Sequence, residues 1–88
     1  MIHVEKPEED KLLKLKVRAW PIWEKEISEF DWEYNETETC YLLEGEVTVT
    51  PEDGKSIKFG KGDLVIFSKG LKCKWNITSP VRKHYKFG

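Results

Sequence analysis

The sequence predicts an all-β domain whose strands form an antiparallel sandwich or barrel. Short runs of β-forming residues are separated by turn residues roughly every 8–12 positions, a spacing typical of such folds. No segment shows the apolar period of an amphipathic helix. The 88 residues provide for one domain, because a chain of this length has room for a single core. We expect a barrel over residues 11–88, preceded by an N-terminal extension over residues 1–10.

The first half of the chain is predicted to hold three extended segments. Apolar and basic residues alternate over positions 11–18, which predicts a half-buried strand. Residues 19–27 include Pro21, which cannot donate a ladder hydrogen bond, so we expect an edge strand or an extended connection there. Alternation returns at residues 30–34, where Phe30, Trp32 and Tyr34 share one face. We expect these three rings to point inward.

The second half reads as a series of strands joined by turns. Residues 38–50 are rich in β-forming residues, and Gly45 interrupts them in a way that indicates a bulge or a bend. The sequence Pro-Glu-Asp-Gly at 51–54 predicts a hairpin onto residues 56–59, with Gly54 supplying the positive φ of a tight turn. Further strands are expected at 64–67, 72–77 and 81–87, with glycine-containing turns at 60–63 and 68–70.

Charge and composition exclude several classes of protein. Fifteen Lys and Arg residues stand against sixteen Asp and Glu, a formal charge of −1 with the signs interspersed, whereas a nucleic-acid-binding domain concentrates basic residues on one face. No apolar run approaches the roughly 20 residues that span a bilayer. The acidic first 11 residues do not look like a signal sequence. We therefore expect a cytoplasmic protein with no nucleic-acid or membrane partner, and the Asn-x-Thr triplets at Asn35 and Asn76 are chance matches.

Two further expectations follow from composition. In the cytoplasm Cys40 and Cys73 are expected as reduced thiols, and a disulfide between them is the minority interpretation. Lysine and glutamate dominate the charged residues and glutamine is absent, a balance more common in heat-stable proteins. A small barrel also leaves sheet edges and aromatic surface uncovered, so a homodimer would suit the chain.

Two glycine-centred motifs carry a resemblance to the cupins. Glu38 is followed after six residues by Gly45, and Gly62, Gly70 and Cys73 keep the spacing of a second motif. The phrases Glu-Thr-Cys-Tyr-Leu-Leu-Glu-Gly at 38–45, Gly-Asp-Leu-Val at 62–65, Lys-Gly-Leu-Lys-Cys-Lys-Trp at 69–75 and Val-Arg-Lys-His-Tyr at 81–85 resemble small single-domain cupins grouped with the cupin domains of ureidoglycine aminohydrolases. The similarity runs from about residue 20 onward, and Ser68 replaces the proline usual in that group. The resemblance implies a cupin-type antiparallel β-barrel, or jelly roll.

The same resemblance argues against the metal that cupins commonly bind. The positions of the cupin His-x-His pair fall on Trp32 and Tyr34, and the second-motif histidine position falls on Cys73. The two histidines of the chain, His3 and His84, lie off both motifs, so one subunit cannot form a three-histidine centre. Glu38 and Cys73 remain as donors, a set closer to zinc chemistry than to manganese, but two donors make a poor site. We expect no metal and no other cofactor.

An aromatic-walled pocket with a carboxylate and a thiol is what remains. We assign Glu38 as general acid or base and Cys73 as nucleophile or proton donor. Four residues are assigned to ligand binding: Trp32, Tyr34, Lys83 and Tyr85. Lys83 and Tyr85 share the apolar parity of the last strand, so Lys83 could pair with Glu38, while His84 lies on the outer face. Trp32, Tyr34, Glu38 and Cys73 are expected to meet in one cavity.

Simpler interpretations stand beside these assignments. Buried cysteines usually pack inertly, so Cys73 is equally explained as core. Trp20, Trp23 and Trp75 are expected in the core or in a dimer interface. Three functions stay open: a metal-independent module that binds a small polar metabolite, such as a sugar-like or amide-bearing compound; an enzyme that uses Glu38 and Cys73; and a non-catalytic dimerising scaffold.

Overall fold

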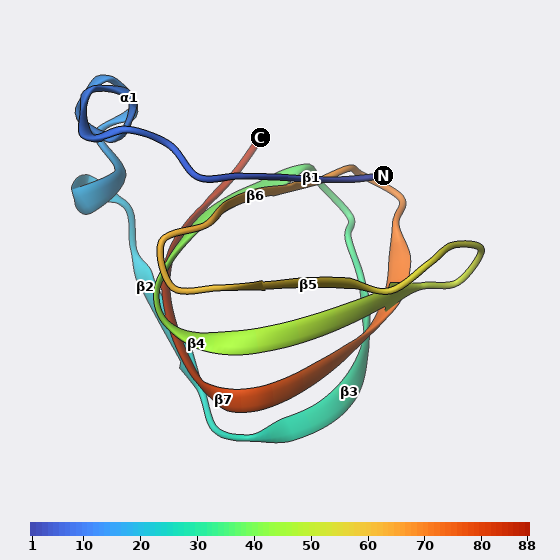
Figure 1. The fold of residues 1–88 in the computed structure, drawn as a ribbon. Coiled ribbons are helices and arrows are strands. Elements are labelled where there is room, and N and C mark those ends of the chain that lie inside the picture. The colour runs from blue at the N-terminus through green and yellow to red at the C-terminus, as the bar shows by residue number, and fades with distance from the viewer.

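The computed structural model describes residues 1–88 as one antiparallel sheet that curls into a barrel (Figure 1). The strands are β1 (Ile2–Glu5), β2 (Ile22–Lys25), β3 (Ser28–Glu33), β4 (Glu38–Pro51), β5 (Ile57–Gly60), β6 (Leu64–Phe67) and β7 (Lys72–Phe87). Their order is β1-β6-β4-β7-β2, with β3 also paired to β7 and β5 to β4. The all-β fold is confirmed, and the strands predicted from residue 30 onward are present.

Strand β7 is the central element of the barrel. It was expected as two strands, but residues 72–87 are continuous. One edge of β7 pairs with β4, while the other pairs first with β3, from Glu33 opposite Lys72 to Ser28 opposite Ile77, and then with β2. Pro21 precedes β2, as expected of a residue that cannot donate within a ladder. Strand β7 thus joins β4 on one side to β3 and β2 on the other.

The bend predicted at Gly45 is present. The β4–β7 register shifts between Leu42 and Val47, and Gly45 has a φ of 111°, which side chains other than glycine rarely adopt. A Cβ at this position would lie 2.7 Å from the carbonyl oxygen of Pro80 and 2.8 Å from the Cα of Val81. Glycine is therefore required both by its backbone angle and by the close approach of β7.

The N-terminal part differs from the prediction. Residues 2–5, expected to lie in an extension, form β1 and pair with β6 from Ile2 opposite Phe67 to Glu5 opposite Leu64.

The hairpin predicted between β4 and β5 is present, but Gly54 does not have the positive φ that we expected of it. Positive φ values are found instead in the two later turns, at Gly62 and Gly70.

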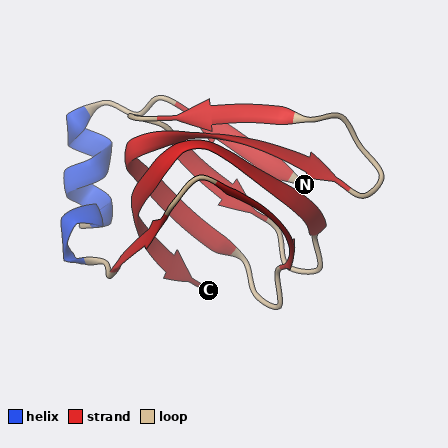
Figure 2. Cartoon of the chain, turned by 90° about the horizontal axis from the view of Figure 1, so that it is seen from below, coloured by secondary structure: helices blue, strands red, loops and turns tan.

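The strand predicted at 11–18 is wrong. The segment forms helix α1 (Glu9–Leu15) and the 3-10 helix η1 (Val17–Ala19), which lie beside the curved sheet (Figure 2). Leu12 and Val17 are buried, whereas Leu13 is 61% exposed and Leu15 38%, so only Val17 of the alternating apolar residues packs into the protein. Glu9 and Asp10 in the first turn and Lys14 in the last suit the helix dipole. Neither helix has the length and apolar character needed to cross a membrane.

The core fills the interior with close-packed apolar side chains. Its largest rings contact one another directly: Tyr34 stacks on Phe67 with centroids 4.6 Å apart, and Phe67 lies 5.7 Å from Trp75. The buried cluster is Tyr34, Cys40, Leu42, Val47, Val49, Phe59, Val65, Phe67, Cys73, Trp75, Ile77 and Val81. Cys40 and Cys73 are both free thiols, as expected. Beside this cluster the barrel is not completely filled.

Candidate functional site

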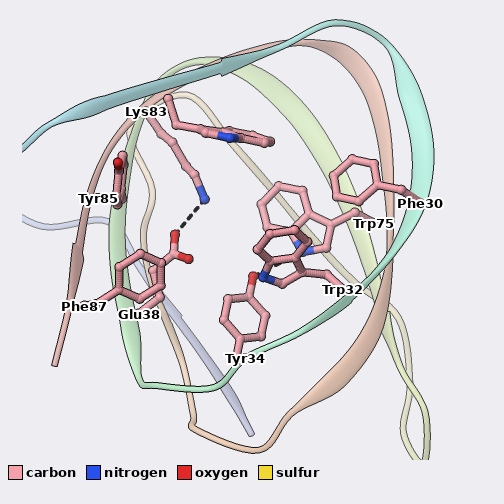
Figure 3. Close-up of a pocket in the computed structure, with 9 residues that line it drawn as sticks. Phe30, Trp32, Tyr34, Glu38, Trp75, Lys83, Tyr85 and Phe87 are labelled. Carbon is pink, nitrogen blue, oxygen red and sulfur yellow. Dashed lines mark hydrogen bonds and ion pairs between the residues drawn. The ribbon is translucent and has the colours of Figure 1, made fainter.

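A cavity of about 170 Å³ opens between β2, β3 and the second half of β7. Seven of its nine lining side chains are apolar or aromatic, and two carry charge (Figure 3). The lining residues are Trp23, Phe30, Trp32, Tyr34, Glu38, Trp75, Lys83, Tyr85 and Phe87. Trp32 is 47% exposed and Phe87 45%, so these two rings lie at the solvent side of the cavity. The site is an aromatic pocket with one ion pair inside it.

That ion pair joins the first residue of β4 to the last strand. Lys83 Nζ donates to Glu38 Oε2 across 2.7 Å, and the two side chains are 6% and 5% exposed. A buried charge is costly unless an opposite charge and a hydrogen bond compensate it, and here each residue meets that need for the other. Lys83 and Tyr85 both enter the barrel, as the parity of β7 predicted (Figure 3).

The ammonium group of Lys83 also lies over two indole rings. Its Nζ is 4.9 Å from the ring centroid of Trp23 and 4.8 Å from that of Trp75, distances at which a cation is attracted to an aromatic face. The protein's own lysine thus occupies the position over these two rings that a cationic ligand would take, and the two charged residues of the cavity lining cancel in formal charge.

The ion pair keeps hydrogen-bonding capacity for a ligand. Of the two carboxylate oxygens of Glu38, Oε2 contacts Lys83, and Oε1 remains as an acceptor. A lysine ammonium has three donors, and one of them is used by Glu38. A molecule inside the cavity thus meets a donor and an acceptor side by side against aromatic walls.

Tyr34 is a structural part of the cavity wall, and its hydroxyl group takes no part in the chemistry of the cavity. Its phenolic oxygen accepts a hydrogen bond from Trp75 Nε1 at 3.1 Å, and its side chain is 1% exposed. Burial is the main cause that raises the pKa of Tyr34 well above its ordinary value of 10.0, and the neighbouring Glu38 adds to it. The phenol therefore stays neutral. Trp75 is a core residue, as expected, with one edge on the cavity.

Cys73 does not line this cavity, and the expected four-residue site is not formed. Trp32, Tyr34 and Glu38 share the cavity, whereas Cys73 borders a second surface groove with Thr50 and Pro51. Trp32 lies opposite Cys73 in the β3–β7 pairing and lines both the cavity and this groove. Burial raises the pKa of its thiol, which disfavours the nucleophilic thiolate. The alternation of side chains along the strand correctly placed Cys73 on the inner face of the sheet. It does not determine how far along the barrel the side chain lies.

Four wall residues were not assigned to the site from the sequence. Phe30 and Phe87 have the inward parity of residues that were assigned, so the same signal could have found them. Trp23 and Trp75 were expected in the core or in a dimer interface and line the cavity. Both rings contact the ammonium group of Lys83, and this contact depends on strand pairing that the sequence pattern does not give.

His84 is not the surface residue that we expected. It is 6% exposed, and its Nδ1 donates to the carbonyl oxygen of Trp20 at 2.9 Å. The side chain does have the outward parity, opposite to Lys83, but the chain leaving η1 covers it. Because the helical segment was predicted as a strand, this cover could not be anticipated.

The residues at the cupin metal positions do not fit a metal ion. No group of three or more His, Cys, Asp or Glu side chains converges anywhere in the structure. Glu38 is engaged by Lys83, whose positive charge repels a cation, and the Tyr34 oxygen is engaged by Trp75. A stable site needs about four donors around zinc and more around harder ions.

The fold and the motif spacing agree with a comparison against known families. A family model described as the EutQ-like cupin domain matches residues 12–85. The chain belongs to the EutQ-like cupin family. The jelly-roll barrel expected from the two motifs is thereby confirmed, while the likeness to ureidoglycine aminohydrolases stays an expectation.

Solved structures of similar proteins support this placement. A DUF861 family protein from Thermotoga maritima is 58% identical, with a TM-score of 0.98 over the full length of both chains. The EutQ protein of Clostridium difficile is 26% identical with a TM-score of 0.68, over 75% of this chain and 52% of that one. A putative ethanolamine utilization protein Q from Salmonella typhimurium is 27% identical with a TM-score of 0.67, over 75% and 53%. This EutQ-like cupin thus spans about half the length of the EutQ proteins. The comparison with curated proteins gave no match.

Proposed function

We propose that this EutQ-like cupin binds a small, uncharged polar metabolite in the aromatic cavity, without a metal. The observation that carries the proposal is the buried Glu38–Lys83 pair on the cavity wall. An ion pair inside a barrel contributes little to stability compared with apolar packing. Its place beside a cavity with free hydrogen-bonding capacity favours a role in recognition.

The chemistry of the pair defines the class of ligand. Glu38 Oε1 can accept a hydrogen bond and the Lys83 ammonium can donate further ones, and the two groups lie next to each other. A carboxamide, a ureide or a pair of neighbouring hydroxyl and carbonyl groups supplies both. The remainder of the ligand would lie against the faces and edges of Phe30, Trp32 and Tyr85, where flat or weakly polar groups pack best.

The size of the cavity sets an upper limit on the ligand. A cavity of about 150 Å³ in another protein binds benzene, and this one measures about 170 Å³. Pockets for drug-sized molecules are roughly 300–1,000 Å³. The ligand is therefore about the size of a single substituted ring, with any larger part extending past Trp32 and Phe87 into solvent.

The cavity disfavours charged ligands of either sign. An organic cation would compete with the Lys83 ammonium for the faces of Trp23 and Trp75, and an anion would face the Glu38 carboxylate. The name of the Salmonella relative refers to ethanolamine utilization. We do not propose the ethanolammonium ion as the ligand here, because Lys83 occupies the position that it would take.

An enzyme is the second candidate, and only in a form without Cys73. Glu38 could move a proton within the cavity with Lys83 as its partner. The dimerising scaffold is the third, and it requires that the cavity bind nothing. Binding measurements separate the scaffold from the other two, and turnover of a bound ligand separates the enzyme from the binding module.

The test uses the tryptophans of the wall as reporters. We expect benzamide to quench intrinsic fluorescence and to raise the melting temperature, whereas benzylamine and benzoate do neither at the same concentration. Lys83→Met should weaken benzamide binding by roughly tenfold or more, since hydrogen bonds to charged groups contribute about 1.5–3 kcal/mol. The control variant Lys74→Met changes an exposed lysine on the same strand, and it should leave benzamide binding unchanged. Equal weak responses to all three compounds would contradict the proposal.

A further inference from the structure

Lys83 differs from every other lysine of the chain. The sequence has thirteen lysines, and Lys83 alone is buried. Its Nζ lies 2.7 Å from Glu38 Oε2, on the wall of a cavity that reaches solvent (Figure 3). The same Nζ also lies over two indole rings. Lysines that act as nucleophiles toward carbonyl compounds are found in such desolvated pockets.

A lysine nucleophile needs a group that takes its proton, and Glu38 is placed to do so. The hydrogen bond between Nζ and Oε2 gives the proton a direct path. The walls of this cavity are mostly aromatic. Transfer of one proton produces a neutral amine beside a neutral carboxylic acid.

We infer that Lys83 forms an imine with a small uncharged aldehyde or ketone that enters the cavity, with Glu38 carrying the proton. The amine lone pair attacks the carbonyl carbon, and Glu38 returns its proton to the carbonyl oxygen to give a carbinolamine. Nζ then gives its second proton to Glu38, which passes it to the departing hydroxyl group. One water leaves, one carbon–nitrogen double bond forms, and no oxidant or reductant is needed.

The same surroundings suit the product. The imine formed by these steps keeps one proton on Nζ, so its positive charge lies where the ammonium charge was, over Trp23 and Trp75 and beside the Glu38 carboxylate. A keto acid would add a second carboxylate next to Glu38, so uncharged carbonyl compounds are the expected class. This inference rests on the proposed function, because both require that a small molecule enter the cavity.

The experiment is reductive trapping on the folded protein. Benzaldehyde is added with sodium cyanoborohydride, which reduces an imine to a stable benzyl amine, and peptide mass spectrometry measures labelling at each lysine. We expect Lys83 to be labelled roughly tenfold faster than the average of the twelve exposed or partly exposed lysines, since a preorganised buried amine is the better nucleophile. Pyruvate should label Lys83 no faster than the others. A Lys83 rate at or below the surface average would overturn the inference.

Two controls show whether the labelling belongs to the cavity. Glu38→Gln removes the proton carrier and should lower the Lys83 rate at least tenfold, whereas Glu44→Gln, an exposed carboxylate on the same strand, should not change it. Because Glu38→Gln could also unfold the chain, circular dichroism is recorded for each sample, and benzamide is tested as a competitor on the unmodified protein. Protection of Lys83 alone by benzamide supports the inference.

The outcomes separate this inference from the proposed function. Benzamide binding without preferential labelling of Lys83 overturns the imine and leaves the binding module standing. Absence of both overturns both. Preferential labelling without benzamide binding supports the imine and overturns the proposed amide-type ligand. Labelling of Lys83 that benzamide fails to reduce, although benzamide binds, places the reaction outside the cavity and overturns the inference.

Discussion

Trp75 and Tyr34 are joined by a hydrogen bond of 3.1 Å from the indole Nε1 to the phenolic oxygen, inside a core where both are 1% exposed. Tyr34 stands at a position where cupins commonly place a metal-binding histidine. In this chain the position has become part of the packing, because the tyrosine ring stacks on Phe67 and its oxygen satisfies the indole. Tyr34 and Trp75 also line the cavity.

Removing the Tyr34 oxygen should destabilise the barrel without changing its shape. In Tyr34→Phe the indole N–H of Trp75 loses its acceptor in the core, and a buried unsatisfied donor costs about 1–3 kcal/mol. Urea denaturation at neutral pH measures the loss. Tyr85→Phe is the matched control, because no hydrogen bond of the Tyr85 oxygen is present to be lost, and it should change the free energy of unfolding by less than about 0.5 kcal/mol. Equal losses in both variants would contradict the assigned role.

Breaking the Glu38–Lys83 pair should cost more than removing it. Glu38→Leu and Lys83→Met each leave one buried charge without a partner, and such changes destabilise proteins by about 3–5 kcal/mol. The double variant replaces both charges with apolar groups and should recover most of that loss. A double-mutant cycle by urea denaturation gives the coupling energy. Additive losses would show that the two charges do not stabilise each other in the barrel.

Stability should fall in alkaline solution, because buried acidic groups, Cys40 and Tyr34 among them, hold their protons more tightly in the folded chain. Burial raises the pKa of the Cys40 thiol from 9.0 to about 12, and it raises the pKa of Tyr34 above 10.0. The stabilising contribution of each group is complete below its unfolded pKa. It declines above that value by about 1.4 kcal/mol per pH unit for each proton, until the folded group ionises as well.

Urea midpoints measured between about pH 8 and pH 11 check this prediction, since the unfolded references lie within that range. Cys40→Ala should reduce the slope that begins near pH 9, and Tyr34→Phe should reduce the slope that begins near pH 10. An unchanged slope in both variants would mean that other groups cause the alkaline loss.

The helix should depend on one of its three leucines more than on the others. Leu12 is 3% exposed and Leu13 61%. Leu12→Ala should therefore cost about 2–5 kcal/mol, as buried leucine truncations do, while Leu13→Ala should change stability by less than about 0.5 kcal/mol. In the strand that the alternating pattern predicts, Leu13 would instead be buried. Urea denaturation of the two variants thus compares the two structures of this segment directly.

The fold from residue 22 onward was predictable because local signals and global packing agree there. Alternation in β3, β4 and β7 reflects one buried face, and Gly45 marks a bend that no other residue fits. The N-terminal segment was not predictable in the same way. Leu13, Leu15 and Val17 alternate by chance, and the left-handed conformation of Lys16 separates α1 from η1 so that no single helical period runs through.

The site was predictable in part for a related reason. Parity in β7 placed Lys83 inside the barrel, and the motif placed Glu38 there, so their meeting followed from the pattern. Parity assigns a side chain to a face of the sheet, not to a depth within the barrel. Cys73 shares the face of Trp75 and was therefore assigned to a cavity that it does not reach.

The pairing of β7 along both of its edges also determines when this chain can fold. Residues 1–71 supply β2, β3 and β4, but these strands reach one another only through β7. During synthesis they emerge from the ribosome with unpaired edges and exposed aromatic rings, which are the features that promote aggregation. Closure waits until residues 72–87 are available, and most of its contacts join distant parts of the chain, which slows folding. Strands β2, β3 and β4 therefore stay unpaired with one another until β7 has been synthesised.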